Sequence, residues 1–242
     1  MNSIIEVSAP SPHSDRGVWR AALAVILAAV LGIPWGTAHA AEWLEGRNYY
    51  KITAPRTPTV APGKVEVTEV FSYACPACNL FVGTMHKLKQ ALPANAELDY
   101  LPAAFNSAED WPMFQQAYFT AQVLGIADKS HDAMFDAVWK THELAVIDPT
   151  TDRLVSHPPT IEDAARFYSK RSGVPVEKFV STAKSFPVDV KIRSADAAIV
   201  QYGVDRTPTI VVNGKYRLNV QSAGGDDQVI ELVKFLVAKE TK

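Results

Sequence analysis

The sequence predicts an α/β fold in which one sheet domain is interrupted by a helical subdomain. Two stretches of alternating, β-branched residues lie far apart in the chain, at Val65–Ser72 and Thr209–Leu218. From Ser107 onward, the segment between them shows the spacing of amphipathic helices instead. Strands on both sides of a block of helices indicate a sheet domain that carries a helical insertion.

The first forty residues have the pattern of a secretory signal peptide. Arg16 and Arg20 precede the apolar run Ala21–Ile33, and small residues follow at Ala38–Ala40. At about 1.5 Å per residue, this run covers roughly 20 Å, which is short of the ~30 Å hydrocarbon core of a membrane. We therefore expect export with cleavage after Ala40, not a membrane anchor.

The elements before the insertion follow one another closely. An edge strand is predicted at Asn48–Thr53, a Pro-rich connector at Ala54–Gly63 and a strand at Val65–Ser72. A helix is predicted after Cys75, and a second strand at Glu97–Phe105. Leu80, Phe81, Met85 and Leu88 give the helix its apolar spacing.

The later elements complete the sheet domain after a series of helices. The predicted helices of the series are WPMFQQAYFTAQVLGI, HDAMFDAVWKTHEL, IEDAARFYSKRSG, VEKFVSTAKSF and VDVKIRSADAAIVQYG. Asn213-Gly214 then predicts a β-hairpin, and a final helix is expected at Asp226–Lys239 with Asp226 as its N-cap. The predicted organisation is a signal peptide (1–40), a first part of the sheet domain (41–106), a helical insertion (107–190) and a second part (191–242).

The composition is that of an ordinary globular protein. Hydrophobic residues make up 48% of the chain and charged residues 21%, with a net charge of −2. A nucleic-acid-binding protein usually has a strongly basic face, and no such charge excess is present. We therefore expect no nucleic-acid partner.

The two cysteines, Cys75 and Cys78, are the only ones in the chain and form the motif CPAC. A zinc site needs about four ligands, and the histidines show no ligand spacing that would supply the rest. Haem attachment needs histidine after the second cysteine, where Asn79 stands. A structural disulfide would close a very short loop and stabilise an exported chain little. The placement favours redox chemistry, with no metal and no bound cofactor.

The position of the motif indicates how the two thiols differ. Because Cys75 is at the start of a helix, unpaired N–H groups and the helix dipole stabilise its thiolate. Cys75 is therefore the expected attacking cysteine, and Cys78, one turn later, the resolving one. Pro76 is tolerated there because its missing N–H would be unpaired anyway.

The chain resembles the DsbA-type thiol–disulfide oxidoreductases of the thioredoxin-like superfamily. The resemblance rests on EVFSYACPAC, on the helical block and on GVDRTPTIVVNGKYRLN, and it spans nearly the whole mature chain. It implies a thioredoxin-like fold with an inserted all-helical subdomain, and a periplasmic enzyme that donates disulfides to newly exported proteins. It also implies a DsbB-type membrane reoxidase as partner, and we expect a monomer.

The resemblance assigns roles to further residues. It implies that Pro208 is cis and faces the cysteines, and that Thr207 contacts the substrate backbone; the alternative is a proline that merely opens a strand. Glu69 shares its strand face with apolar residues, so burial would raise its pKa and let it exchange protons with Cys78. The alternative for Glu69 is a half-exposed strand glutamate.

Two departures from the family pattern bear on activity. Well-known members have histidine where Ala77 stands, so we expect a less oxidising disulfide here, with a Cys75 pKa still below that of a free thiol. The strand Glu97–Phe105 also lacks the lysine that often accompanies the buried acid.

Other interpretations remain open at this point. One is a periplasmic reductase or isomerase, although Ala41–Gly63 is too short for the dimerisation domain that such isomerases add. The other is a chaperone-like binder of exported chains without enzymatic activity. Tyr73, Phe81 and Trp111 are candidates for apolar surface that binds clients, with core packing as the alternative.

Overall fold

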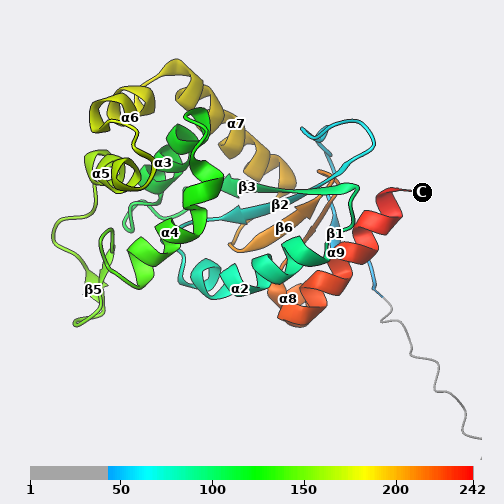
Figure 1. The fold of residues 1–242 in the computed structure, drawn as a ribbon. Coiled ribbons are helices and arrows are strands. Elements are labelled where there is room, and N and C mark those ends of the chain that lie inside the picture. Colours follow the sequence, from blue (N-terminus) through cyan, green and yellow to red (C-terminus); the bar gives the residue numbers. More distant parts are fainter. Residues whose placement is uncertain (1–42, 242) are drawn as a thin grey trace, which may run out of the picture. The chain divides into compact units, whose positions relative to one another are not determined.

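The computed structural model describes residues 43–241, and the predicted signal peptide lies outside them. The described chain contains a five-stranded sheet in the order β1-β7-β6-β2-β3 (Figure 1). The strands are Tyr50–Lys51 (β1), Val65–Phe71 (β2), Ala96–Pro102 (β3), Thr209–Val212 (β6) and Tyr216–Leu218 (β7). β2 pairs in parallel with β3 and antiparallel with β6, so the strand that leads to CPAC lies inside the sheet.

Helices cover both faces of this sheet. Helices α2 (Pro76–Ala91) and α9 (Asp226–Glu240) pack on one face, where they share a buried cluster with Val65 and Val67 of β2. Helix α7 (Phe186–Tyr202) covers the opposite face and packs against Val70. All seven residues of β2 are therefore buried, although their sequence alternates between apolar and polar.

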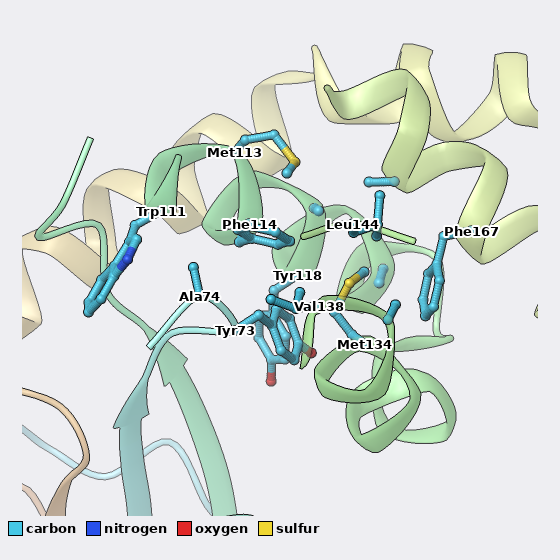
Figure 2. Close-up of a cluster of buried hydrophobic side chains, with 14 of the residues drawn as sticks. Tyr73, Ala74, Trp111, Met113, Phe114, Tyr118, Met134, Val138, Leu144 and Phe167 are labelled. Carbon is cyan, nitrogen blue, oxygen red and sulfur yellow. The ribbon is translucent and has the colours of Figure 1, made fainter. Parts of the chain in front are cut away.

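Four further helices form the insertion. They are α3 (Trp111–Val123), α4 (Ala127–Trp139), α5 (Ile161–Ser172) and α6 (Val176–Ala183), and they lie beside the carboxyl end of β2 and its neighbour β3 (Figure 1). Their buried side chains form one cluster with Phe71, Tyr73, Cys75 and Cys78. Figure 2 shows part of this cluster, with Tyr73 near Phe114 and Tyr118 of α3. The cysteine motif thus lies where the sheet domain meets the insertion. The predicted fold class, an α/β thioredoxin-like fold with a helical insertion, is confirmed.

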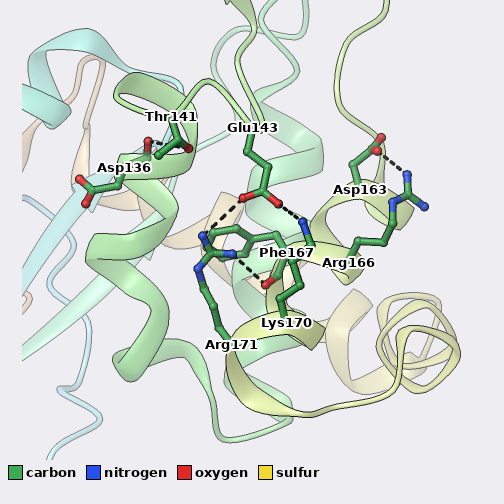
Figure 3. A network of polar contacts seen from close by, with 8 residues as sticks. All are labelled: Asp136, Thr141, Glu143, Asp163, Arg166, Phe167, Lys170 and Arg171. Atoms are coloured by element: carbon green, nitrogen blue, oxygen red, sulfur yellow. Dashed lines mark hydrogen bonds and ion pairs between the residues drawn. The ribbon is translucent and has the colours of Figure 1, made fainter.

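A polar network ties the segment after α4 to α5. The Glu143 carboxylate accepts hydrogen bonds from Lys170 at 2.7 Å and from Arg171 at 3.4 Å (Figure 3). The Arg171 guanidinium also lies 3.8 Å from the centre of the Phe167 ring. These two cations lower the pKa of Glu143, mainly through the hydrogen bond from Lys170.

Three details differ from the sequence-based expectations. Leu80 was expected among the buried positions of its helix, but it is 81% exposed, because Cys78, Phe81, Met85 and Leu88 already form the buried face. Asp226 is not the N-cap of α9: Gly225 holds that position, and Asp226 accepts a hydrogen bond from Thr84 at 2.8 Å. The insertion also contains a hairpin that was not predicted, with strands Ile147–Asp148 (β4) and Arg153–Leu154 (β5).

The last short element is helix α8 (Val220–Ala223), which begins with a capping box between Asn219 and Ser222. Across residues 43–241, no helix is both long enough and apolar enough to cross a membrane.

Candidate active site

Cys75 is the N-cap residue of α2, and Pro76 is the first residue of the helix. The Cys75 Sγ atom accepts a hydrogen bond from the Cys78 N–H at 3.4 Å, as the side chain of an N-cap residue normally does. Both cysteines are free thiols in this structure. The predicted placement of Cys75 at the start of a helix is confirmed, and the sulfur itself satisfies one of the unpaired N–H groups of the first turn.

The surroundings of Cys75 favour its thiolate. A hydrogen bond from the Cys78 thiol is the largest cause that lowers the pKa of Cys75, to about 6, while burial opposes it. The backbone N–H groups of Cys78 and Ala77 act in the same direction. The nearby Thr207 hydroxyl also lowers the Cys75 pKa. This hydroxyl has no hydrogen-bond partner of ordinary geometry in the described structure. Cys75 is therefore mostly ionised at neutral pH.

Cys78 has the opposite character. It is 1% exposed, and burial raises its pKa well above that of a free thiol. The hydrogen bond with Cys75 raises it further, as does Glu69 when it is ionised. At neutral pH the pair therefore consists of one thiolate and one thiol, which is the division expected of an attacking and a resolving cysteine.

Glu69 is fully buried in β2, on the face that also carries Val65 and Val67. Burial, followed by repulsion from a Cys75 thiolate, raises the pKa of Glu69 to about 8. Its partner in the β3 ladder is Tyr100, so no lysine occupies that place. The expectation of a buried carboxyl group with a raised pKa is confirmed, and the alternative of a half-exposed glutamate is wrong.

The Thr207-Pro208 peptide bond is cis, as the resemblance implied. In its protonated form, the Cys75 thiol donates to the Thr207 carbonyl oxygen, with Sγ and O 3.7 Å apart. Residues 132 positions apart in the sequence are thus brought together at one site. Pro208 directly precedes β6, which pairs with β2, and this pairing holds the two loops at the same end of the sheet.

Small and apolar side chains surround the cysteines on the surface. Pro76 and Ala77 are exposed, and the exposed side chain of Leu80 follows one turn later. The aromatic candidates for a client-binding surface are instead buried: Tyr73 is 1% exposed, Phe81 3% and Trp111 8%. Those three residues belong to the core, and Leu80 is the exposed apolar residue that the sequence interpretation missed.

These features define a class of protein. A strand that leads into CxxC at a helix start, a thiolate-favouring first cysteine and a cis-proline loop beside it form the site of a thioredoxin-fold thiol–disulfide oxidoreductase. Within residues 43–241, no three His, Cys, Asp or Glu residues are grouped so that they could hold a metal ion.

Comparisons with known proteins narrow this class. The chain is 34% identical to the thiol:disulfide interchange protein DsbA of Pseudomonas aeruginosa over 203 residues, which covers 84% of this chain and 88% of that protein. It is 33% identical to DsbA of Pseudomonas syringae pv. tomato over 218 residues, covering 90% and 92%. No protein-family model matches the chain.

Solved structures of DsbA proteins are also similar to this chain. The crystal structure of Pseudomonas aeruginosa DsbA superimposes with a TM-score of 0.68 at 33% identity, covering 82% of this chain and 94% of that one. DsbA from Xylella fastidiosa gives a TM-score of 0.70 at 29% identity, covering 82% and 97%. The chain belongs to the DsbA family of thiol:disulfide interchange proteins, and it is a protein dithiol–disulfide oxidoreductase that carries the cysteine pair Cys75 and Cys78.

Ala77 leads to a prediction about the strength of the oxidant. We expect Ala77→His to lower the Cys75 pKa by about 1, because an imidazole at this exposed position adds a donor near the thiolate. The equilibrium constant for oxidising a dithiol should then rise by up to about tenfold. Titration of the thiolate absorbance measures the pKa, with Ala77→Phe as a control of similar bulk without a donor. An unchanged or raised pKa in the histidine variant would contradict the prediction that histidine at position 77 stabilises the thiolate.

Proposed function

We propose that this protein is a periplasmic oxidase that transfers the Cys75–Cys78 disulfide to newly exported proteins. A client thiolate attacks the Cys75 sulfur, the bond between the two cysteines breaks, and Cys78 leaves as a thiolate. Glu69, whose carboxyl group is buried near Cys78, supplies the proton that Cys78 takes up. The client is then joined to Cys75 by a mixed disulfide.

A second client thiolate completes the transfer. It attacks the client sulfur of the mixed disulfide, and Cys75 leaves as a thiolate, so that the client gains a disulfide and the enzyme pair holds both electrons. A thiol of low pKa is a good leaving group, which favours this direction. Because the pKa of Cys78 is raised well above that of a free thiol, Cys78 stays protonated and seldom attacks Cys75 to reverse the step.

Client binding is assigned to the surface beside the thiols. We assign the backbone of Thr207, before the cis Pro208, to hydrogen bonds with an extended client segment. Leu80, together with Pro76 and Ala77, offers a small exposed apolar area to the client side chains.

The proposal includes the cellular setting. Residues 1–40 direct export, with cleavage after Ala40, and the mature chain acts as a monomer in the periplasm. A DsbB-type membrane reoxidase removes the two electrons after each transfer. The sheet domain comprises 41–106 and 191–242 and the insertion 107–190, with helix α7 running continuously across the second boundary.

The observation that carries this function is the position of Cys75 at the N-cap, where its sulfur accepts the Cys78 N–H. The experiment that tests it mixes the oxidised protein with an equimolar reduced peptide containing two cysteines. We expect one peptide disulfide to form for each enzyme disulfide consumed. A peptide that stays reduced while the enzyme stays oxidised would exclude the oxidase.

A further inference from the structure

The turn that carries Cys75 is anchored to the insertion through one buried residue, Tyr73. The Tyr73 carbonyl oxygen accepts a hydrogen bond from Trp139 Nε1 at 2.8 Å. At the other end of the same residue, the Tyr73 hydroxyl lies 2.9 Å from His131 Nδ1. Tyr73 and the following Ala74 are each only 1% exposed.

Both anchors belong to helix α4, and their spacing fits a single face. His131, Phe135 and Trp139 follow one another at intervals of four residues, which places them along one side of a helix over about 12 Å. The Phe135 ring packs between the two anchors, with its centre 5.0 Å from that of the Tyr73 ring. Tyr73 therefore lies along α4 and contacts three successive positions of that face.

The hydrogen bond with His131 involves no charged group at neutral pH. Burial lowers the pKa of His131 to about 4, so the ring is neutral at neutral pH, with one nitrogen as donor and the other as acceptor. Burial also raises the pKa of Tyr73, which therefore keeps its hydroxyl proton. The bond between the Tyr73 hydroxyl and His131 Nδ1 therefore joins two neutral groups.

The same turn determines where the Cys75 sulfur lies. The Cys75 N–H donates to the Ser72 carbonyl at 3.2 Å, and the Ala74 N–H donates to the Ser72 hydroxyl at the same distance. Only Ala74 separates Tyr73 from Cys75, so a shift of the Tyr73 carbonyl moves the N-cap residue. The Cys75 thiolate is stabilised by N–H donors at the start of α2, and the Cys78 nitrogen lies 3.4 Å from the Cys75 Sγ atom. If the turn relaxed, the sulfur would move away from these donors.

We propose that Trp139 and His131 are positioning residues, which act through Tyr73 to hold the Cys75 sulfur against the donors at the start of α2. By this route the helical insertion, which lies outside the thioredoxin-like sheet domain, sets the reactivity of the thiol. The inference rests on the proposed function, because it assigns these residues to the reactive cysteine of that function.

The test removes each hydrogen bond and keeps an aromatic side chain at each position. In Trp139→Phe and Tyr73→Phe, we expect the Cys75 pKa to rise by about 0.5 and the equilibrium constant for oxidising a dithiol to fall about threefold. The matched controls are Trp111→Phe, which removes an indole N–H bonded to Glu109, and Tyr118→Phe, which alters a second buried tyrosine of the same cluster. The controls should leave the pKa within 0.1 of wild type, even where the melting temperature falls.

The outcomes separate the two proposals. A raised pKa in either folded variant, with unchanged controls, supports the positioning role. If the Cys75 pKa is low in the wild type and equally low in both variants, the positioning role is wrong and the proposed function is unaffected. An ordinary thiol pKa in the wild type would overturn the proposed function, and this inference with it.

Discussion

Replacement of Cys75 by alanine is expected to abolish the oxidation of a two-cysteine peptide, with a loss of at least about 10³-fold, because it removes both the enzyme disulfide and the cysteine that forms the mixed disulfide. With a pKa of about 6, Cys75 is about nine-tenths thiolate at pH 7, whereas Cys78 remains protonated. The rate is measured by separating reduced from oxidised peptide after acid quenching.

Cys78→Ala is the matched control, since it also removes the enzyme disulfide but keeps the attacking thiol. Offered a peptide activated as a mixed disulfide with an aromatic thiol, the Cys78→Ala protein should capture the peptide on Cys75 and release the aromatic thiol. The Cys75→Ala protein should capture almost none. If Cys75→Ala retained the wild-type effect on client folding, the chain would be a binder with an incidental cysteine pair.

Replacement of Glu69 by glutamine is expected to stabilise the reduced protein by about 3 kcal/mol at pH 7. The pKa of Glu69 is raised from 4.5 to about 8 on folding, so folding at pH 7 requires the carboxylate to take up a proton. This penalty is absent below about pH 4.5, grows as the pH rises, and levels off above about pH 8. Glutamine carries no such penalty, so the variant gains most at neutral and higher pH.

Thermal unfolding of the reduced protein between pH 4.5 and 8 measures this effect. At pH 7 the melting temperature of Glu69→Gln should exceed that of the wild type by roughly 6–12 °C, and the two should converge near pH 4.5. Glu66→Gln is the control on the opposite face of β2, where the carboxylate accepts hydrogen bonds from Thr59 and Thr68. The Glu66→Gln substitution should lower the melting temperature of the reduced protein. Equal melting temperatures at every pH for Glu69→Gln and wild type would show that Glu69 is ionised in the folded state.

The sequence was sufficient where the signal is local. Alternation in Val65–Ser72, the CPAC motif and the helical spacing after it lie within one short segment, and this segment folds as a strand, a turn and a helix. The buried state of Glu69 was also predictable, because its face of the strand is otherwise apolar. The hairpin β4–β5 was not predictable, since two-residue strands are too short to show a period.

Contacts between residues that are far apart in the sequence could not be predicted from local sequence patterns. The bond between Tyr73 and His131 spans 58 positions, and that between Trp139 and the Tyr73 carbonyl spans 66. No local spacing indicates such pairs, because only the packing of the insertion against the end of the sheet brings them together. Leu80 was misplaced for a similar reason: its exposure depends on which helix face the sheet covers.

The redox equilibrium of the purified protein with glutathione distinguishes an oxidase from a reductase. Because the reduced state is stabilised through the Cys75 thiolate, we predict a reduction potential at least about 60 mV above the −270 mV or so of thioredoxin, about 100-fold in equilibrium constant. The pair would then be reduced at glutathione ratios that leave a thioredoxin-like disulfide intact. A potential at or below that of thioredoxin would contradict the oxidase and identify a reductase.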